Sequence, residues 1–220
     1  MSKFVAFDLD DTLYKEKDFV KSAHNHISLI LSKKYNQPYD NLLSILQKNT
    51  KPFNKLSETI QSFGGKEDIS WLLNEYRYHI PNLLLATNVE NSLIQLKDNN
   101  ISMGIITDGR KISQYNKIYA LGLLKFINKN NIIISEEIGY EKHFDNGFKL
   151  IMSLNPNCNK FYYVGDNLSK DFFWPNQLGW TTICLKDNGQ NIHKQNFNID
   201  KEYLPQHIIH NFSEIIPLIL

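Results

Sequence analysis

The chain has 220 residues, of which 42% are hydrophobic and 21% charged, so its composition is that of a globular protein and excludes a disordered or fibrous one. The 24 Lys and Arg residues nearly balance the 23 Asp and Glu residues. The resulting formal net charge of +1 gives no overall field that would draw the chain onto nucleic acid or an anionic membrane.

Cysteine content and hydropathy narrow the class of protein further. Cys158 and Cys184 lie far apart and have no second pair with which to build a disulfide framework or a zinc site. Asp8 interrupts the first apolar run before it could serve as a signal peptide, and no apolar stretch approaches the ~20 residues of a membrane span. We therefore expect a cytoplasmic protein with neither a nucleic-acid nor a membrane partner. The oligomeric state has no visible signature.

The first predicted elements are a short buried strand and a long helical segment. Lys3 to Phe7 is an apolar run of strand length. From about Glu16 to about Asn82 the strand signal is absent, and apolar residues recur in four stripes with helical spacing. The first stripe consists of Phe19, Ala23, Ile27 and Ile30. We predict that residues 16–82 form an inserted, all-helical domain, and that residues 1–15 and 83–220 form the main domain.

Further strands in the main domain alternate with helical patterns. The predicted strands are Ser102 to Ile106, Asn131 to Ile134, Lys160 to Val164 and Trp180 to Leu185. The helix after the second strand is marked by Ile112, Tyr115, Ile118 and Tyr119. Such alternation predicts an α/β fold with an open, mostly parallel, Rossmann-like sheet and helices on both faces. The polar stretch from Lys186 to about Pro205 is interpreted as a surface loop, and Phe212 to Leu220 as a final helix.

Polar residues follow the strand ends, where ligands bind in an open parallel sheet. In chain order they are Asp8 and Asp10, then Thr107, Asp108 and Gly109, then Lys142 in a loop, then Asp166 and Asp171. Several carboxylates meeting in one crevice would repel one another unless a cation lay among them. Ligands that are all oxygen suit a hard ion, and Mg²⁺ is the expected one.

These residue types favour phosphoryl transfer. Asp8 and Asp10 are separated by one residue, so in an extended chain their side chains lie on the same side. One carboxylate can attack phosphorus while the other protonates the leaving oxygen and later takes a proton from water. Lys142 would neutralise charge on the nucleophile, and Thr107 would hold a phosphoryl oxygen through its hydroxyl.

The segment from Asp8 to Leu13 resembles motif I of the haloacid dehalogenase-like hydrolase superfamily, which has the form D-x-D-x-T-[LV]. In order with Thr107, Lys142 and the Gly165-Asp166…Asp171 pattern, the hexapeptide becomes a specific signal. The resemblance covers roughly the first 15 residues and the chain from about Leu83 to Leu185. The helical insert is similar to the C1-type cap of that superfamily, a lid that closes over the substrate.

The resemblance implies a role for each matching position. Asp8 corresponds to the nucleophile and a metal ligand, and Asp10 to the acid/base residue that also offers its backbone carbonyl to Mg²⁺. Asp166 corresponds to a further metal ligand, and Asp171 supports the metal from the outer shell. Thr107 and Lys142 complete the catalytic set. The residues expected to bind the phosphate are Leu9, Asp10, Thr107, Asp108, Gly109 and Lys142.

One position departs from the family pattern. His143 stands where the family commonly has Pro after the lysine of motif III. Since that Pro shapes a turn and carries no chemistry, we expect a locally altered loop with Lys142 still in place. His143 itself is expected to be solvated in preference to facing the substrate.

Together these features predict a Mg²⁺-dependent phosphatase that hydrolyses a small, soluble phosphorylated metabolite through an aspartyl-phosphate. A phosphomutase on the same scaffold and a non-catalytic phosphometabolite-binding module remain as alternatives. Dehalogenation is disfavoured because it needs neither Asp10 nor a metal cluster. A structural interpretation also exists, in which Asp11 or Thr12 only caps the next helix and Thr107 to Gly109 is only a turn. The identity of the substrate is left open.

Overall fold

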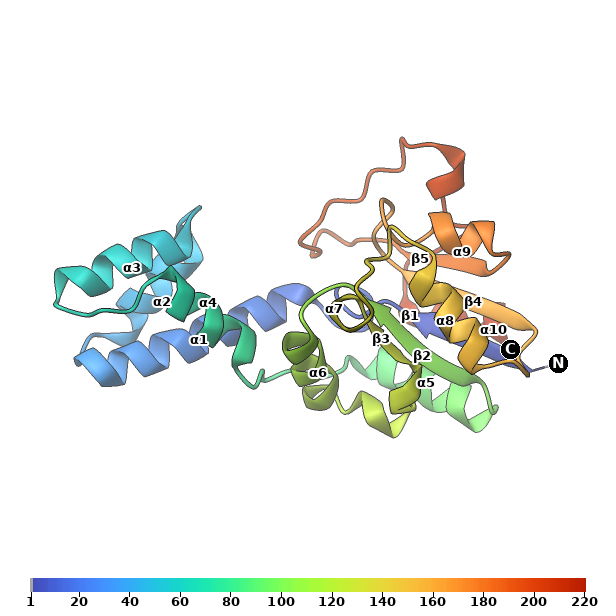
Figure 1. Cartoon of the computed structure of the whole chain (residues 1–220), viewed down its shortest axis with the longest axis horizontal. Helices are drawn as coiled ribbons and strands as arrows, with labels where there is room; N and C mark the ends of the chain where they lie inside the picture. Colours follow the sequence, from blue (N-terminus) through green and yellow to red (C-terminus); the bar gives the residue numbers. More distant parts are fainter. Residues whose placement is uncertain (1) are drawn as a thin grey trace. The chain divides into compact units, whose positions relative to one another are not determined.

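A computed structural model describes residues 2–220, and within them it contains one sheet of six parallel strands (Figure 1). The strands are β1 (Lys3–Phe7), β2 (Ser102–Thr107), β3 (Ile132–Ile134), β4 (Lys160–Gly165), β5 (Thr181–Leu185) and β6 (His207–Ile209). Their order in the sheet is β3-β2-β1-β4-β5-β6, and every neighbouring pair is parallel. The predicted α/β fold with an open parallel sheet is therefore confirmed.

The sixth strand was not predicted from the sequence. β6 is only three residues long, and two of them, His207 and Ile208, are exposed. It pairs with β5 alone and forms one edge of the sheet. A short, half-exposed edge strand lacks the apolar run by which the other five strands were recognised.

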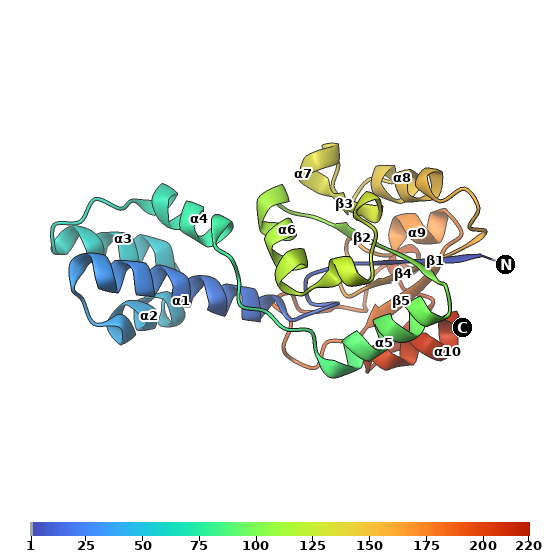
Figure 2. The same cartoon turned by 90° about the horizontal axis from the view of Figure 1, so that it is seen from below.

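Helices cover both faces of the sheet (Figure 2). α5 (Thr87–Asp98) and α10 (Ile215–Ile219) lie on one face, and α8 (Asn146–Leu154) and α9 (Phe173–Gln177) lie on the other. Two more helices, α6 (Lys111–Ala120) and α7 (Ser135–Ile138), follow β2 and β3. The short 3-10 helices are η1 (Leu123–Lys125), η2 (Lys129–Asn131), η3 (Lys201–Tyr203) and η4 (Phe212–Glu214). The predicted C-terminal helix is thus η4 continued by α10.

A large aromatic cluster stabilises the sheet domain. Trp180 is almost completely buried and packs edge-on against Phe148, with ring centroids 5.7 Å apart, and in a stack with Phe161 at 5.0 Å. Burying a side chain of this size contributes roughly 1.5–3 kcal/mol. The cluster joins α8 to β4 and the start of β5, so it fixes the strands whose ends carry the site.

Asp18–Leu83 form a second compact unit with its own core. Its helices are α1 (Glu16–Tyr35), which begins in the sheet unit, α2 (Tyr39–Lys48), α3 (Pro52–Ser62) and α4 (Ile69–Tyr78). The core consists of Ile27, Leu31, Leu42, Leu46, Leu56, Ile60 and Leu72. The predicted stripe of the first helix is corrected at one position, because Leu31 is fully buried whereas Ile30 is only partly buried.

Two features bear on the class of protein. Cys158 and Cys184 are free thiols, and Cys184 is buried in the sheet domain. In the described part of the chain, no helix combines the length and the apolar character needed to cross a bilayer.

Candidate active site

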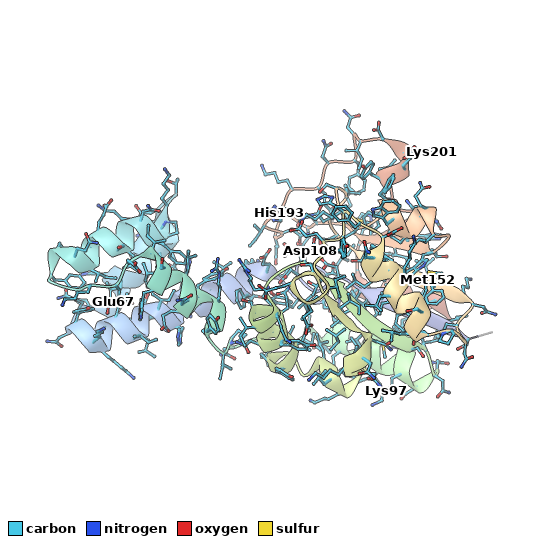
Figure 3. The ribbon with its side chains drawn as sticks, in the orientation of Figure 1. Glu67, Lys97, Asp108, Met152, His193 and Lys201 are labelled. Carbon is cyan, nitrogen blue, oxygen red and sulfur yellow. The ribbon has the colours of Figure 1, made fainter. Side chains whose placement is uncertain are left out.

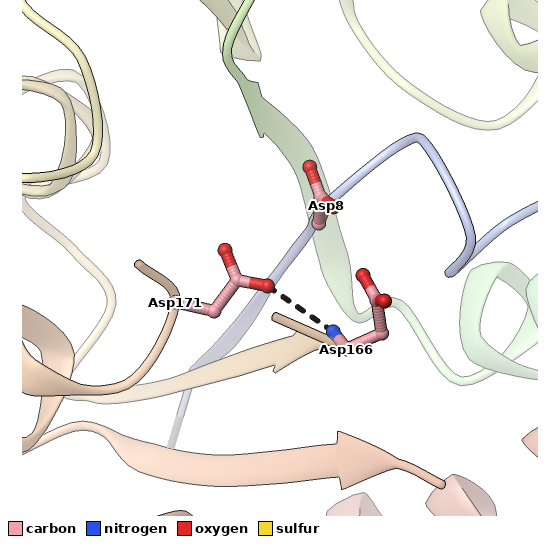
Figure 4. Close-up of side chains that lie close together, drawn as sticks. All are labelled: Asp8, Asp166 and Asp171. Atoms are coloured by element: carbon pink, nitrogen blue, oxygen red, sulfur yellow. Dashed lines mark hydrogen bonds between the residues drawn. The ribbon is translucent and has the colours of Figure 1, made fainter. Parts of the chain in front are cut away.

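Residues from three adjacent strands meet at the carboxyl edge of the sheet. Asp8 follows β1, Thr107 is the last residue of β2, and Asp166 follows β4. Because β1 lies between β2 and β4, these positions are neighbours in space, and the Asp8 amide donates to the Val164 carbonyl at 2.9 Å. One side-chain oxygen from each of Asp8, Asp166 and Asp171 lies within 4.8 Å of the other two (Figure 4).

Lys142 reaches this carboxylate group from the loop after α7. Its side chain is 5% exposed, and its Nζ lies 2.8 Å from Asp8 Oδ1 and 2.5 Å from Asp171 Oδ1. The Lys142 amide donates to Asp108 Oδ1 at 3.0 Å, which fixes the loop to the end of β2. His143 is exposed, and its carbonyl accepts a hydrogen bond from Trp174 Nε1 at 2.6 Å. The missing proline therefore leaves Lys142 beside Asp8.

Burial and the repulsion between neighbouring carboxylates disfavour the ionised forms of Asp8 and Asp166. Burial raises the pKa of Asp8 to about 7, even though Lys142 acts in the opposite direction. Burial, followed by the charges of Asp171 and Asp8, raises the pKa of Asp166 to about 9. Burial acts to lower the pKa of Lys142, but the charges of Asp171 and Asp8 raise it well above its ordinary value. A single ammonium does not compensate three buried carboxylates, and an oxygen-only donor set suits a hard divalent cation.

Asp171 is fully buried, and protein groups occupy both of its oxygens. Oδ1 meets Lys142, and Oδ2 accepts hydrogen bonds from the backbone amides of Asp166 at 3.1 Å and Asn167 at 2.9 Å. The absence of a side chain at Gly165 permits this arrangement, since a Cβ there would lie 2.5 Å from Asp171 Oδ2. Asp171 thus fixes the turn that carries Asp166.

Asp10 is held by a set of side chains that the sequence did not reveal. Lys117 Nζ lies 2.8 Å from Oδ1 and 2.9 Å from Oδ2, Gln114 Nε2 lies 3.0 Å from Oδ2, and the Tyr14 hydroxyl donates to Oδ1. Burial acts to raise the pKa of Asp10, but Lys117, together with hydrogen bonds from Tyr14 and Gln114, outweighs it and lowers the pKa.

The orientation of α6 explains why Lys117 and Gln114 were missed. Ile112, Tyr115, Ile118 and Tyr119 predicted a helix here, and α6 confirms it, but these apolar residues do not mark its buried face. The residues that the structure buries are Ser113, Gln114, Lys117 and Ile118. Ile112 and Tyr119 are exposed. The inward face of α6 is polar because it meets Asp10 and Thr107 instead of an apolar core; Gln114 Nε2 also donates to Thr107 Oγ1 at 2.7 Å.

A cavity of about 150 Å³ opens beside these residues. The predicted site residues that line it are Asp8, Asp10, Thr107, Asp108, Lys142 and Asp166. Leu9 and Gly109 lie apart from it: the Leu9 side chain is fully buried, and the exposed Gly109 donates its amide to Ser135 Oγ at 2.9 Å. Asp171 is fully buried and does not line the cavity.

Other lining residues had not been expected from the sequence. One of them is Lys170, whose Nζ lies 3.3 Å from Asp108 Oδ2. Another is Glu16, whose pKa is raised to about 7 by burial and, next, by the charge of Asp10. His193 comes from the stretch interpreted as a surface loop, and Figure 3 labels it together with Asp108. The stretch is a loop, as predicted, and it also contributes to the lining of the cavity, which the sequence did not reveal. The capping alternative for Asp11 also has a basis, since its Oδ1 accepts the amide of Glu16 at the start of α1.

Comparison with known proteins places the chain in a family. A family model described as haloacid dehalogenase-like hydrolase matches residues 5–183. A glyceraldehyde 3-phosphate phosphatase of Methanocaldococcus jannaschii is 28% identical in an alignment of 196 positions that covers 84% of this chain and 85% of the relative. The glyceraldehyde 3-phosphate phosphatase of Methanothermobacter thermautotrophicus is 25% identical in an alignment of 228 positions, gaps included, that covers 98% of each chain.

The fold has a counterpart among solved structures. The HAD-hydrolase YfnB of Bacillus subtilis, solved bound to magnesium, has a TM-score of 0.69 and 20% sequence identity over 99% of this chain and 98% of its own. At this level of identity the similarity shows the fold alone.

Proposed function

The chain belongs to the haloacid dehalogenase-like hydrolase family, and from this membership we propose that it is a Mg²⁺-dependent phosphatase in which Asp8 is the nucleophile. The observation that carries the proposal is the convergence of Asp8, Asp166 and Lys142 at one edge of the sheet. Asp8 Oδ1 lies 2.8 Å from the Lys142 ammonium, and Asp166 lies close enough to share a cation with it. A carboxylate so placed can attack phosphorus while its own charge is neutralised.

The reaction has two halves. Asp8 attacks phosphorus, the bond from phosphorus to the alcohol oxygen breaks, and Asp10 delivers a proton to that oxygen. Water then attacks the phosphorus of the aspartyl-phosphate, Asp10 takes a proton from it, and Asp8 is released together with inorganic phosphate. Lys117 favours the ionised form of Asp10, which is the form that accepts the proton from water.

Other residues hold the transferring group and the cation. Thr107 Oγ1 accepts a hydrogen bond from Gln114 Nε2, and its own hydroxyl meets the Asp108 carbonyl only at a long 3.5 Å, so the hydroxyl hydrogen can turn to a phosphoryl oxygen. Lys142 offers positive charge on the same side. Asp8, Asp166 and the backbone carbonyl of Asp10 would hold Mg²⁺, with Asp171 supporting them through the Asp166 turn. Bound Mg²⁺ supplies charge neutralisation for the phosphoryl oxygens.

The proposed substrate is a small phosphorylated metabolite. The cavity beside Asp8, at about 150 Å³, has room for a phosphoryl group. The names of the two archaeal relatives make glyceraldehyde 3-phosphate the first compound to test. We propose that the unit Asp18–Leu83 acts as the cap over that substrate.

Phosphate release tests the proposal. The protein is incubated with glyceraldehyde 3-phosphate, p-nitrophenyl phosphate and acetyl phosphate, with Mg²⁺ or with a chelator. We expect Mg²⁺-dependent release that Asp8→Asn abolishes, whereas Asp145→Asn, whose side chain pairs with Lys149 on the surface, keeps the wild-type rate. Phosphorus NMR separates the alternatives: an isomerised phosphoester without free phosphate indicates a mutase. Absence of turnover on a broad panel indicates a binding module.

A further inference from the structure

The loop between β5 and β6 folds back onto the metal-ligand candidates. Within it, Asn191 donates from Nδ2 to Asp166 Oδ2 at 2.8 Å, and its Oδ1 accepts a hydrogen bond from Lys15 Nζ at 2.6 Å. An amide between a carboxylate and an ammonium has one favourable orientation, with nitrogen toward the carboxylate and oxygen toward the ammonium. The Lys15 charge also polarises the amide and strengthens its donation to Asp166.

The backbone of the loop is fixed just before this contact. The Asp187 side chain accepts hydrogen bonds from the amides of Gly189 and Gln190, both at 2.8 Å, and of Asn191 at 3.0 Å. Immediately after Asn191, the amide of Ile192 donates to Asp11 Oδ2 at 2.9 Å. Asn191 therefore sits between two anchored points, so its position does not depend on its side chain alone.

The far end of the loop is tied to the same residue. Gln195 Nε2 donates to the backbone carbonyls of Asp166 and Leu185, both at 2.8 Å, and its Oε1 accepts the amide of Asp187 at 2.8 Å. Asp166 thus receives one hydrogen bond on its side chain and one on its carbonyl from a single loop. A loop that only covered the surface would have no reason to converge on one buried carboxylate.

We propose that Asn191 is a positioning residue for the metal site, which orients Asp166 through the loop anchored by Asp187. This inference rests on the proposed function. Asn191 holds Oδ2, whereas Oδ1 meets Thr12 Oγ1 at a distant 3.5 Å and is the oxygen left available to a cation. Hydrogen-bond partners of metal ligands fix ligand orientation, and their loss typically weakens metal binding about 10–100-fold.

Calorimetric titration of the substrate-free protein with MgCl₂ tests this proposal. We expect Asn191→Ala to raise the Mg²⁺ dissociation constant about tenfold. Asp187→Ala does not alter the side chain that contacts Asp166, yet it should act in the same direction because it releases the turn. The matched control is Gln190→Ala in the same turn. The Gln190 side chain accepts a hydrogen bond from the exposed Lys17, and the variant keeps the backbone hydrogen bond from residue 190 to Asp187, so we expect it to bind Mg²⁺ like the wild type.

The outcomes separate this inference from the proposed function. Circular dichroism and thermal unfolding without metal establish that each variant is folded, and Asn191 is only partly buried, so its substitution should not prevent folding. If the wild-type protein binds Mg²⁺ and Asn191→Ala binds it with an unchanged or lower dissociation constant, the inference is overturned and the phosphatase proposal stands. A wild-type protein that binds no Mg²⁺ overturns both. An equal loss in Gln190→Ala and Asn191→Ala also refutes the specific role of Asn191.

Discussion

Lys117 contacts both carboxylate oxygens of Asp10, at 2.8 and 2.9 Å, in a position where the Lys117 side chain is 6% exposed and the Asp10 side chain 20%. The pair joins a helix of the sheet domain to the segment that follows β1. Breaking a buried pair by removing one partner leaves an uncompensated charge and typically costs about 3–5 kcal/mol. The relationship therefore affects both stability and chemistry.

The first prediction concerns Lys117→Met. We expect a lower free energy of unfolding, by about 3 kcal/mol, and a kcat reduced by about 10–100-fold, since Asp10 loses the partner that holds it for general base catalysis. Denaturant titration and steady-state kinetics measure the two effects. Lys111→Met is the control on the same helix, because Lys111 pairs with Glu137 at the surface and should contribute less than about 1 kcal/mol. Equal effects of the two substitutions would contradict the prediction.

Asp10→Asn separates binding from chemistry. The backbone carbonyl of Asp10 is the atom proposed to face Mg²⁺, so the substitution should leave Mg²⁺ affinity nearly unchanged. The side chain is the proposed acid/base, so turnover should fall by about 10²–10⁴-fold. Calorimetry and phosphate release measure the two quantities. A variant with the wild-type rate would show that Asp10 is not the acid/base.

Gly165→Ala tests the support behind Asp166. The added Cβ would lie 2.5 Å from Asp171 Oδ2, where the two backbone hydrogen bonds of the Asp166 turn are received. We expect a loss of about 1–3 kcal/mol in stability together with weaker Mg²⁺ binding. Gly147→Ala is the control: its Cβ would meet only side-chain methyl groups, those of Ile106 at 3.3 Å, Ile133 at 3.5 Å and Ile138 at 3.7 Å, so the variant should fold and bind Mg²⁺ normally. Wild-type Mg²⁺ binding by Gly165→Ala would show that Asp171 tolerates displacement.

Much of this site followed from strand ends. Asp8, Thr107 and Asp166 were placed correctly at one edge because short apolar runs end just before them, and parallel strands bring their carboxyl ends together. Lys142 was found in its loop by a motif, and the structure places its ammonium beside Asp8. These inferences need only short sequence patterns and the rule that parallel strands bring their carboxyl ends to one edge of the sheet.

The missing parts depend on tertiary context. Lys117 and Gln114 lie on the inward face of α6, which is polar because it meets Asp10 and Thr107. From hydropathy alone, a polar helix face is predicted to face solvent. Asn191 belongs to a stretch whose polar composition is typical of a surface loop. It contacts Asp166, 25 positions earlier in the chain, because the loop folds back. No periodic pattern in the sequence predicts that this loop folds back onto Asp166.

The fourth prediction concerns acid stability of the helical unit. Glu67 is buried and accepts hydrogen bonds from Lys34 and the Tyr35 hydroxyl. Burial acts to raise the pKa of Glu67, but these two partners outweigh it and lower the pKa to about 2 from an ordinary 4.5. Because the folded pKa is lowered, the stabilisation is complete above pH 4.5 and is lost as the pH falls toward 2.

We therefore expect Glu67→Gln to lower the stability of this unit by about 1–3 kcal/mol at neutral pH, with the difference from wild type shrinking between pH 4.5 and pH 2. Thermal unfolding over this pH range measures it. Glu58→Gln removes an exposed pair with Lys55 and serves as the control, with no pH-dependent difference expected. A difference between Glu67→Gln and wild type that persists at pH 2 would show that Glu67 acts through packing alone.

The central place of β1 in the sheet has a consequence for how the protein is made. The strand that leads to Asp8 is translated before both of its neighbours, which are residues 102–105 and 160–164. At about 5–20 residues per second it waits on the order of ten seconds for its second neighbour to leave the ribosome. Pairings this distant in sequence also form slowly. Nascent chains that end before β4 therefore hold Asp8, the proposed nucleophile, without one wall of its crevice, and activity should emerge only after β4 has been translated.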